Sequence, residues 1–282
     1  MQLSEVGQAA RAGDRDRFEA ALFEDDEPLR ERFFTLIALN AELARTRLRV
    51  SEPHIGLIRL QWWRDAIEEA VAGDPPRAHE LAAPVSALVR TAPDGFAAEL
   101  TRLVDAWERD LDPEPFASLD ALRLQLEATA GRMTRLGGYL ALGAAPEGEE
   151  EAALSSVGLA DGAARALAAT PLLAAEQRAM LPLKGAALAS LLKGAPNEEA
   201  EASARALARL GLEALGRGEA AARALGDESQ ARLKPWLLSS WRAKRLLRLL
   251  TRDGSEILRD CGPESPFRRR ASLLLRGIFG RF

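Results

Sequence analysis

The chain has 282 residues, of which 47% are hydrophobic and 28% charged, and its formal net charge is −4. No run approaches the ~20 uncharged apolar residues of a membrane-spanning helix, and the charged first thirty residues are unlike a signal peptide. The single cysteine, Cys261, excludes an internal disulfide and, beside only two histidines, a zinc site built on two cysteines. We therefore expect a globular protein without a structural metal.

Intrinsic propensity and apolar spacing favour helices throughout. Alanine and leucine are abundant, whereas the strand-favouring residues Val, Ile, Thr and Tyr are scarce. Helical spacing and Pro- or Gly-rich stops predict helices over 14–24, 29–50, 54–72, 78–91, 94–110, 118–143, 152–170, 183–193, 197–226 and 229–260. The second and third of these are predicted to form an antiparallel hairpin. Because the connections are short, we predict one all-α domain over residues 1–282, with about eight to ten helices.

The stretch from Phe33 to Ala70 carries the most specific pattern in the chain. Its order is Asn40, Glu42, Leu43 and Ala44, then Ser51, Glu52, Ile55 and Gly56, then Gln61 and Trp63. This order resembles the squalene/phytoene synthase family, and within it the non-catalytic sub-group that contains a phytoene-synthase-like assembly factor of mitochondrial complex I. Weaker matches extend the resemblance over roughly residues 14–280. It implies a single isoprenoid-synthase-type helical bundle around a central cavity.

The resemblance also shows where the metal-binding residues of the family are missing. Active members hold Mg2+ with carboxylates four residues apart, which share one helix face and supply the oxygen ligands that this ion prefers. In this chain the matching positions are Ala44, Arg45 and Leu48 in the first motif and Ala169 and Leu173 in the second. Residues 43–51 and 162–175 contain no Asp or Glu, so a shift in register restores neither motif. We expect no bound metal and no cofactor, and the missing ligands favour a protein that is not an enzyme.

Several residues near these motifs are candidates for lining a cavity or a partner surface. They are Asn40, Glu42, Arg45, Gln61, Trp62, Trp63 and Arg178. Replacement of an acid by Arg45, with Arg47 and Arg49 nearby, makes the site less favourable for Mg2+ and more favourable for an anion. The alternative is that these arginines lie on a solvated helix face and pair with acids such as Glu42 or Glu52.

The C-terminal part of the chain is basic, with 13 Lys or Arg against 4 Asp or Glu over residues 232–282. Its last segment, 266–282, has the composition of a basic amphipathic tail. The candidate membrane contacts are Arg268, Arg269, Arg270, Leu274, Ile278 and Phe279. Such a segment can bury its apolar face among lipid headgroups and place arginines on anionic lipid. A terminal helix that closes the bundle fits the pattern equally well.

These observations predict a non-catalytic assembly or stability factor for respiratory complex I, the NADH:quinone oxidoreductase. The sub-group resemblance supplies this function, and the missing aspartates and basic tail agree with it. The expected place is the cytoplasm, peripheral to the inner membrane, or the matrix side in a mitochondrion. The expected partners are respiratory-complex subunits or another membrane protein, with an anionic membrane surface or a prenyl lipid as further ligands, and not nucleic acid. The alternatives are a divergent squalene/phytoene-synthase-like prenyltransferase and a prenyl-lipid-binding protein.

Overall fold

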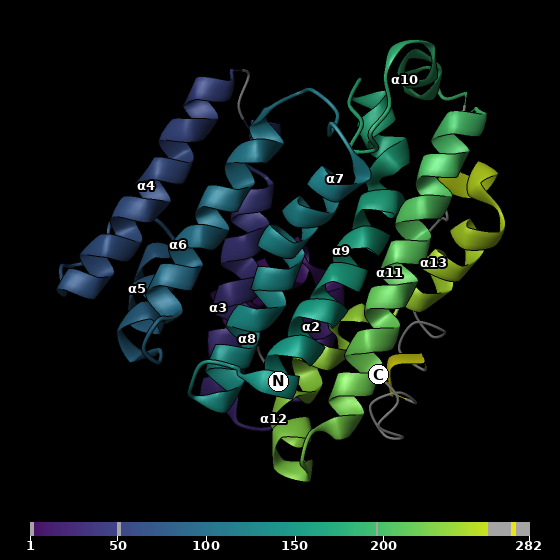
Figure 1. Cartoon of the computed structure of the whole chain (residues 1–282). Helices are drawn as coiled ribbons and strands as arrows, with labels where there is room; N and C mark the ends of the chain where they lie inside the picture. The colour runs from purple at the N-terminus through teal and green to yellow at the C-terminus, as the bar shows by residue number, and fades with distance from the viewer. Residues whose placement is uncertain (1–2, 50–51, 196, 259–271, 275–282) are drawn as a thin grey trace.

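The structure, a computed structural model, describes residues 3–49, 52–195, 197–258 and 272–274. Within these ranges it contains thirteen α-helices and no strand, so the prediction of an all-α fold is confirmed. The longest helices, α9 and α11, pack along each other, and α4 stands at the opposite edge of the bundle (Figure 1). Among the described residues, no helix is both long and apolar enough to cross a membrane.

In chain order the helical elements are α1 (Glu5–Gly13), α2 (Arg15–Ala21), α3 (Glu27–Ala44), η1 (Arg47–Arg49), α4 (Pro53–Ala72), α5 (Ala82–Thr91), α6 (Phe96–Ala106), η2 (Trp107–Leu111), α7 (Leu119–Leu126), η3 (Glu127–Gly131), α8 (Arg132–Leu142), α9 (Gly148–Ala175), α10 (Gly185–Leu192), α11 (Glu198–Ala224), α12 (Asp227–Leu237), η4 (Leu238–Ser240), α13 (Ala243–Arg252) and η5 (Gly254–Leu258). The η3 element is a π-helical turn, and the other short elements are 3-10 turns. The predicted first helix, 14–24, corresponds to α2, which begins where the Asp14 side chain accepts from the Arg17 amide, and α1 before it was not predicted.

Helix α9 differs from its prediction at its C-terminal end. We predicted a stop at residue 170, because the proline that follows lacks an N–H and its ring crowds the preceding turn. The helix instead runs through Pro171 to Ala175. Leu173 and Ala174 in this last turn are buried, so packing against the core offsets the missing backbone hydrogen bond.

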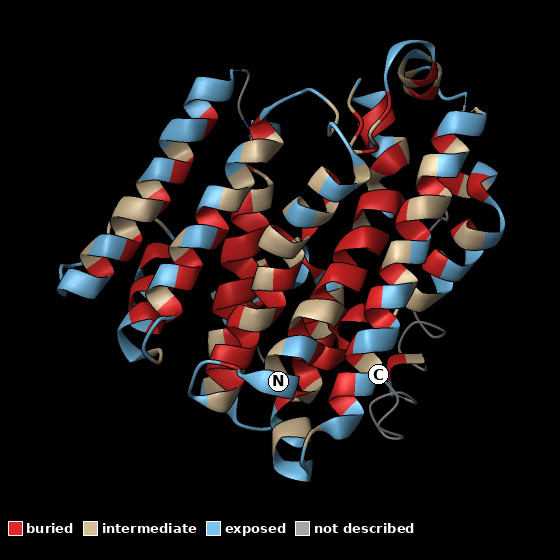
Figure 2. Ribbon diagram, in the orientation of Figure 1, coloured by how far each residue is buried: buried red, intermediate tan, exposed pale blue. Residues whose placement is uncertain are grey.

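The predicted hairpin of α3 and α4 is wrong. Every residue of α3 from Phe33 to Leu43 is buried, which makes it a helix of the core. Helix α4 packs on α5, α6 and η2 instead, and one stripe of its surface is buried, comprising Gly56, Leu60, Trp63, Ile67 and Ala70. Its other faces are largely exposed (Figure 2). The two helices follow each other in sequence, but α4 lies at the edge of the bundle.

Close contacts at glycines set the position of α9 against its neighbours. A Cβ atom added to Gly158 would lie 2.7 Å from the Cα atom of Gly131 in the π-helical turn. One added to Gly218 of α11 would lie 2.8 Å from Cγ2 of Val157. Both distances are shorter than packed atoms tolerate, so the absence of side chains lets α9 approach two elements at once.

A buried network of four charges ties the start of the chain to the middle of α9. Arg17 donates from Nη2 to Asp161 Oδ2 at 2.8 Å and from Nη1 to Asp14 Oδ2 at 3.0 Å. Arg165 reaches the same two carboxylates, at 2.8 Å from Nε to Asp161 and 3.1 Å from Nη1 to Asp14. The side chains of Asp14, Arg17 and Asp161 are less than 10% exposed, whereas that of Arg165 is 37% exposed. The two positive and two negative charges balance, as buried charges require.

Most of the basic tail lies outside the described residues. The candidate membrane contacts outside them are Arg268, Arg269, Arg270, Ile278 and Phe279. In the described part, Leu273 is buried against Ala20, Leu238 and Trp241, whereas Leu274 is 53% exposed. Leu273 therefore packs on the bundle, as a terminal segment that closes the core would do.

Replacing Asp161 by alanine should destabilise the protein by about 3–5 kcal/mol, because it leaves Arg17 and Arg165 with one carboxylate between them in a buried site. The free energy of unfolding in urea measures this cost. Asp120→Ala is the matched control, since its ion pair with Arg123 is on the surface and Asp120 is 70% exposed; it should cost less than about 1 kcal/mol. Equal losses in the two variants would show that the network does not anchor the N-terminal helices.

The same network should make stability depend on acid pH. Burial alone would raise the pKa of Asp14, but Arg165 and Arg17 outweigh it and lower this pKa from 3.8 to about 2. The folded state therefore holds the proton less tightly than the unfolded state, and the stabilisation is present above pH 4 and lost as the pH falls to 2. Between these values the unfolding free energy of the wild type should fall by about 2 kcal/mol more than that of Asp14→Asn. Parallel curves for the two proteins would contradict this assignment.

Candidate functional site

The positions of the missing aspartates lie together at one end of the bundle, where α3 and α9 both end. Ala44 is the last residue of α3, and Leu48, in the following turn η1, is 56% exposed. On α9, Ala169 is half-buried and Leu173 is buried. These positions therefore present no oxygen ligand to a metal.

An ion-pair network holds this end of the bundle closed. Arg47 of η1 lies 3.3 Å from Asp110 Oδ2 and 2.6 Å from Glu176 Oε2, which joins η1 to the ends of η2 and α9. Arg178 donates to the backbone carbonyls of Asp110 and Asp112 at 2.7 Å and 2.5 Å. The space left between these groups and Leu173 is about 20 Å3, enough for a water molecule and no more.

Electrostatics at this network follow from burial and from the crowding of guanidinium groups. Burial raises the pKa of Asp110, and the opposing attraction of Arg47 and Arg178 does not fully cancel that effect. Burial and the nearby Arg47 lower the pKa of Arg178. The carboxylates here are already paired with arginines. The described residues contain no group of three His, Cys, Asp or Glu placed to hold a metal. These side chains do not fit the Mg2+ ion that the fold family implies.

The other candidates on α3 are engaged in contacts within the protein. The Asn40 side-chain oxygen accepts from Trp107 Nε1 at 3.3 Å. Glu42 is buried, and its Oε1 atom accepts from Arg49 at 2.5 Å and from Arg59 at 3.1 Å. Arg49 therefore pairs with Glu42, as the alternative to an anion site predicted.

Arg45 is the remaining position of the first degenerate motif and lies directly after the last residue of α3. Its side chain points toward the N-terminal helices. Its Nη2 atom donates to the backbone carbonyl of Ala12 at 2.9 Å. This arginine therefore connects the end of α3 to the end of α1, and its guanidinium does not join the network around Arg47.

The candidates on α4 form a separate cluster. Trp63 is buried, and Trp62 packs edge-on against it with ring centroids 4.8 Å apart. His79 contacts both rings, and Arg77 lies over Trp62 at 5.5 Å. Gln61 is exposed on the outer side of the helix. The tryptophan pair therefore anchors the 77–79 connection, and the structure does not bring it together with Arg178.

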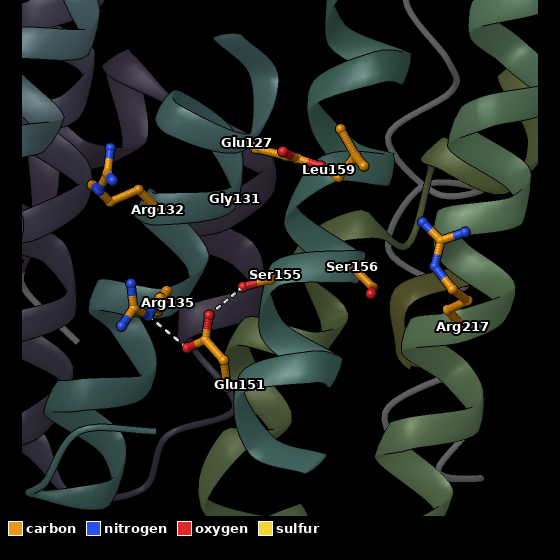
Figure 3. Close-up of a pocket in the computed structure, with 9 residues that line it drawn as sticks. All are labelled: Glu127, Gly131, Arg132, Arg135, Glu151, Ser155, Ser156, Leu159 and Arg217. Carbon is orange, nitrogen blue, oxygen red and sulfur yellow. Dashed lines mark hydrogen bonds and ion pairs between the residues drawn. The ribbon is translucent and has the colours of Figure 1, made fainter. Parts of the chain in front are cut away.

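A larger pocket of about 230 Å3 lies elsewhere, between η3, α8, α9 and α11 (Figure 3). Arg135 pairs with Glu151 at 2.5 Å, Ser155 donates to the same carboxylate at 2.7 Å, and Arg217 of α11 is a further lining residue. Sequence reasoning missed this pocket because its lining comes from four elements and carries no local motif. Arg135 and Glu151 neutralise each other's charge inside this pocket.

Sequence comparison places the chain among known proteins. The family model for squalene/phytoene synthases matches residues 10–276. Over 151 residues the chain is 32% identical to the mouse protein named NADH dehydrogenase (ubiquinone) complex I, assembly factor 6, and over 157 residues it is 30% identical to the human protein of that name. These alignments cover 52% and 55% of the chain but 43% and 45% of the relatives. The match thus spans less than half the length of those proteins.

Solved structures agree on the fold. Squalene synthase HpnC from Alicyclobacillus acidocaldarius superposes with a TM-score of 0.70 at 16% identity, covering 88% of this chain and 92% of that one. A ligand-bound dehydrosqualene synthase gives 0.72 at 11% identity, covering 98% and 95%. At such identities the likeness concerns the fold, and it extends over nearly the whole chain. With a family model that matches residues 10–276, the chain belongs to the squalene/phytoene synthase family.

Proposed function

We propose that this protein is a non-catalytic assembly or stability factor for respiratory complex I and acts at the membrane surface. The observation that carries the proposal is its similarity to complex I assembly factor 6 of mouse and human, at 32% and 30% identity. The state of the aspartate positions agrees with it, because an assembly factor works by binding and needs no metal. Respiratory-complex subunits are the proposed partners.

The arrangement around Arg47 supports a binding role over prenyl transfer. Departure of a diphosphate needs strong positive charge placed where the leaving group develops its own charge. Here Arg47 donates hydrogen bonds to Asp110 and Glu176, and Arg178 donates to the backbone of the 110–112 turn. The pocket of about 20 Å3 beside them is far smaller than a prenyl diphosphate.

The second candidate function is a divergent prenyltransferase, with prenyl-lipid binding as a variant of it. The fold favours this candidate, because the chain superposes on two squalene-forming or related synthases over most of its length. The two candidates differ in one measurable property, which is turnover of a prenyl diphosphate in the presence of Mg2+.

Deletion of the gene in the source organism should lower the amount and activity of assembled NADH:quinone oxidoreductase in its membranes. The physical reason is that an assembly factor stabilises an intermediate that otherwise dissociates or aggregates. Native gels of membranes, stained for NADH oxidation, measure the effect, and a restored wild-type copy is the control. Unchanged complex in the deletion strain would remove the assembly role.

The purified protein should release no pyrophosphate from a prenyl diphosphate above the background rate, with or without Mg2+. The positions equivalent to the family's aspartates, among them Ala169 and Leu173, supply no oxygen ligand. A colorimetric pyrophosphate assay, run beside an active squalene synthase, measures this. Mg2+-dependent release by this chain would favour the transferase instead.

A further inference from the structure

The pocket between η3, α8, α9 and α11 lies apart from the groups that support the proposed function. It measures about 230 Å3, and five of its nine lining residues are arginine or glutamate. Pockets for drug-sized ligands measure ~300–1,000 Å3, so this one suits a smaller, polar molecule. Leu159, the lining residue nearest in sequence to Ala169, is separated from it by about 15 Å of helix. The pocket is therefore distinct from the altered aspartate site.

One wall of the pocket is the π-helical turn η3. Glu127 and Gly131, the first and last residues of this turn, both line the pocket. Such turns are rare, and they occur frequently at functional sites. The position of the Glu127 carboxylate in this wall is thus set by an unusual backbone conformation.

The charged groups on the α8 side of the pocket are already paired. Arg132 and Arg135 both contact the buried carboxylate of Glu99, and Arg135 also pairs with Glu151. A third arginine that contacts Glu99, Arg102, is 61% exposed and does not line the pocket. The two arginines that line this side are therefore balanced by two carboxylates.

Two lining groups of opposite charge have free hydrogen-bonding capacity on the two sides of α9 (Figure 3). Glu127 accepts from Arg123 at 2.7 Å through its Oε1 atom, and no described residue donates to its Oε2 atom. Arg217 of α11 is exposed and forms no hydrogen bond or ion pair with a described residue. The Ser156 hydroxyl has no described partner either, and a Cβ atom added to Gly218, next to Arg217, would lie 3.2 Å from Ser156 Cβ. The α11 side thus offers donors and the η3 side an acceptor.

A ligand that carries both charges satisfies both sides at once. An acidic oxyanion pairs with the Arg217 guanidinium and accepts from the Ser156 hydroxyl, and an ammonium group donates to Glu127. Leu159 supplies an apolar surface for the carbon atoms between these groups. A purely anionic ligand would meet the carboxylates of Glu127 and Glu151, and a purely cationic one would meet three arginines. The charge pattern therefore favours a molecule with both charges over one with either alone.

We propose that this pocket binds a small zwitterion, a molecule with an ammonium group and an acidic oxyanion a few bonds apart. Free amino acids have this chemistry, and so does ethanolamine phosphate, which is also the headgroup of a phospholipid. The proposal goes beyond the assembly role and does not depend on it, because it rests on the lining of this pocket alone.

Isothermal titration calorimetry of the full chain with four probes tests the proposal. L-alanine and O-phosphoethanolamine are zwitterions, whereas inorganic phosphate and ethanolamine each carry one kind of charge. At least one zwitterion should bind roughly tenfold or more tightly than either single-charge probe, because only a zwitterion forms both ion pairs.

Substitutions on the two sides of the pocket should each weaken binding of that zwitterion. Arg217→Ala and Glu127→Gln should each reduce its affinity roughly tenfold or more, since each removes one charged partner. Arg209→Ala is the matched control, because Arg209 lies about two turns earlier on α11, is also exposed and does not line the pocket. This variant should bind like the wild type.

Flotation with vesicles that contain phosphatidylethanolamine distinguishes the two sources of the zwitterion. If O-phosphoethanolamine is the preferred probe, and the wild type floats with these vesicles while Arg217→Ala does not, the ligand is a lipid headgroup. Otherwise the zwitterion that binds is a free molecule. Binding of neither zwitterion, equal affinity for phosphate or ethanolamine, or an equal loss in Arg209→Ala and Arg217→Ala would overturn the proposal.

Discussion

The contact of Asp161 with Arg17 and Arg165 is the interaction on which the arrangement of the bundle depends. It joins α2 to the middle of α9 across 144 positions of sequence, and the side chains of Arg17 and Asp161 are both buried. Charges in such a place are stable only as a balanced set, so the four side chains specify one position for the N-terminal helices. The glycine contacts of α9 act on the same element, because they bring it close to η3 and α11.

One face of α9 carries both this network and the altered site. Asp161, Arg165, Ala169 and Leu173 are each four residues apart, so they follow one another along a single stripe of the helix. The stripe is charged and paired in its first half and apolar in its second, and Glu176 beyond it binds Arg47. The face that carries metal ligands in active members of the family is thus used in this chain for internal contacts.

Helix type and approximate position could be predicted from the sequence because they depend on local spacing, propensity and caps. The end of α9 could not, since the burial of Leu173 that keeps the helix intact past Pro171 is a tertiary effect. The edge position of α4 was missed for a similar reason. At the site, the loss of aspartates could be read from residues 43–51 and 162–175. The ion pairs that occupy this end of the bundle instead could not be predicted, because Arg47 contacts Asp110 and Glu176, which are 63 and 129 residues away in sequence.

The degree of replacement bears on how this chain could have come to differ from the active enzymes. Changing a single aspartate to alanine would leave an open site that lacks one ligand. Here Arg47 and Arg178 bind carboxylates and backbone carbonyls, and Leu173 is buried beside them. A carboxylate restored at position 173 would replace the buried leucine and lie beside Arg47 and Arg178, where its oxygens would be paired before a metal arrived. The altered end of the bundle is therefore held together by its own ion pairs, backbone hydrogen bonds and packing, and it differs from a metal site that has lost a single ligand.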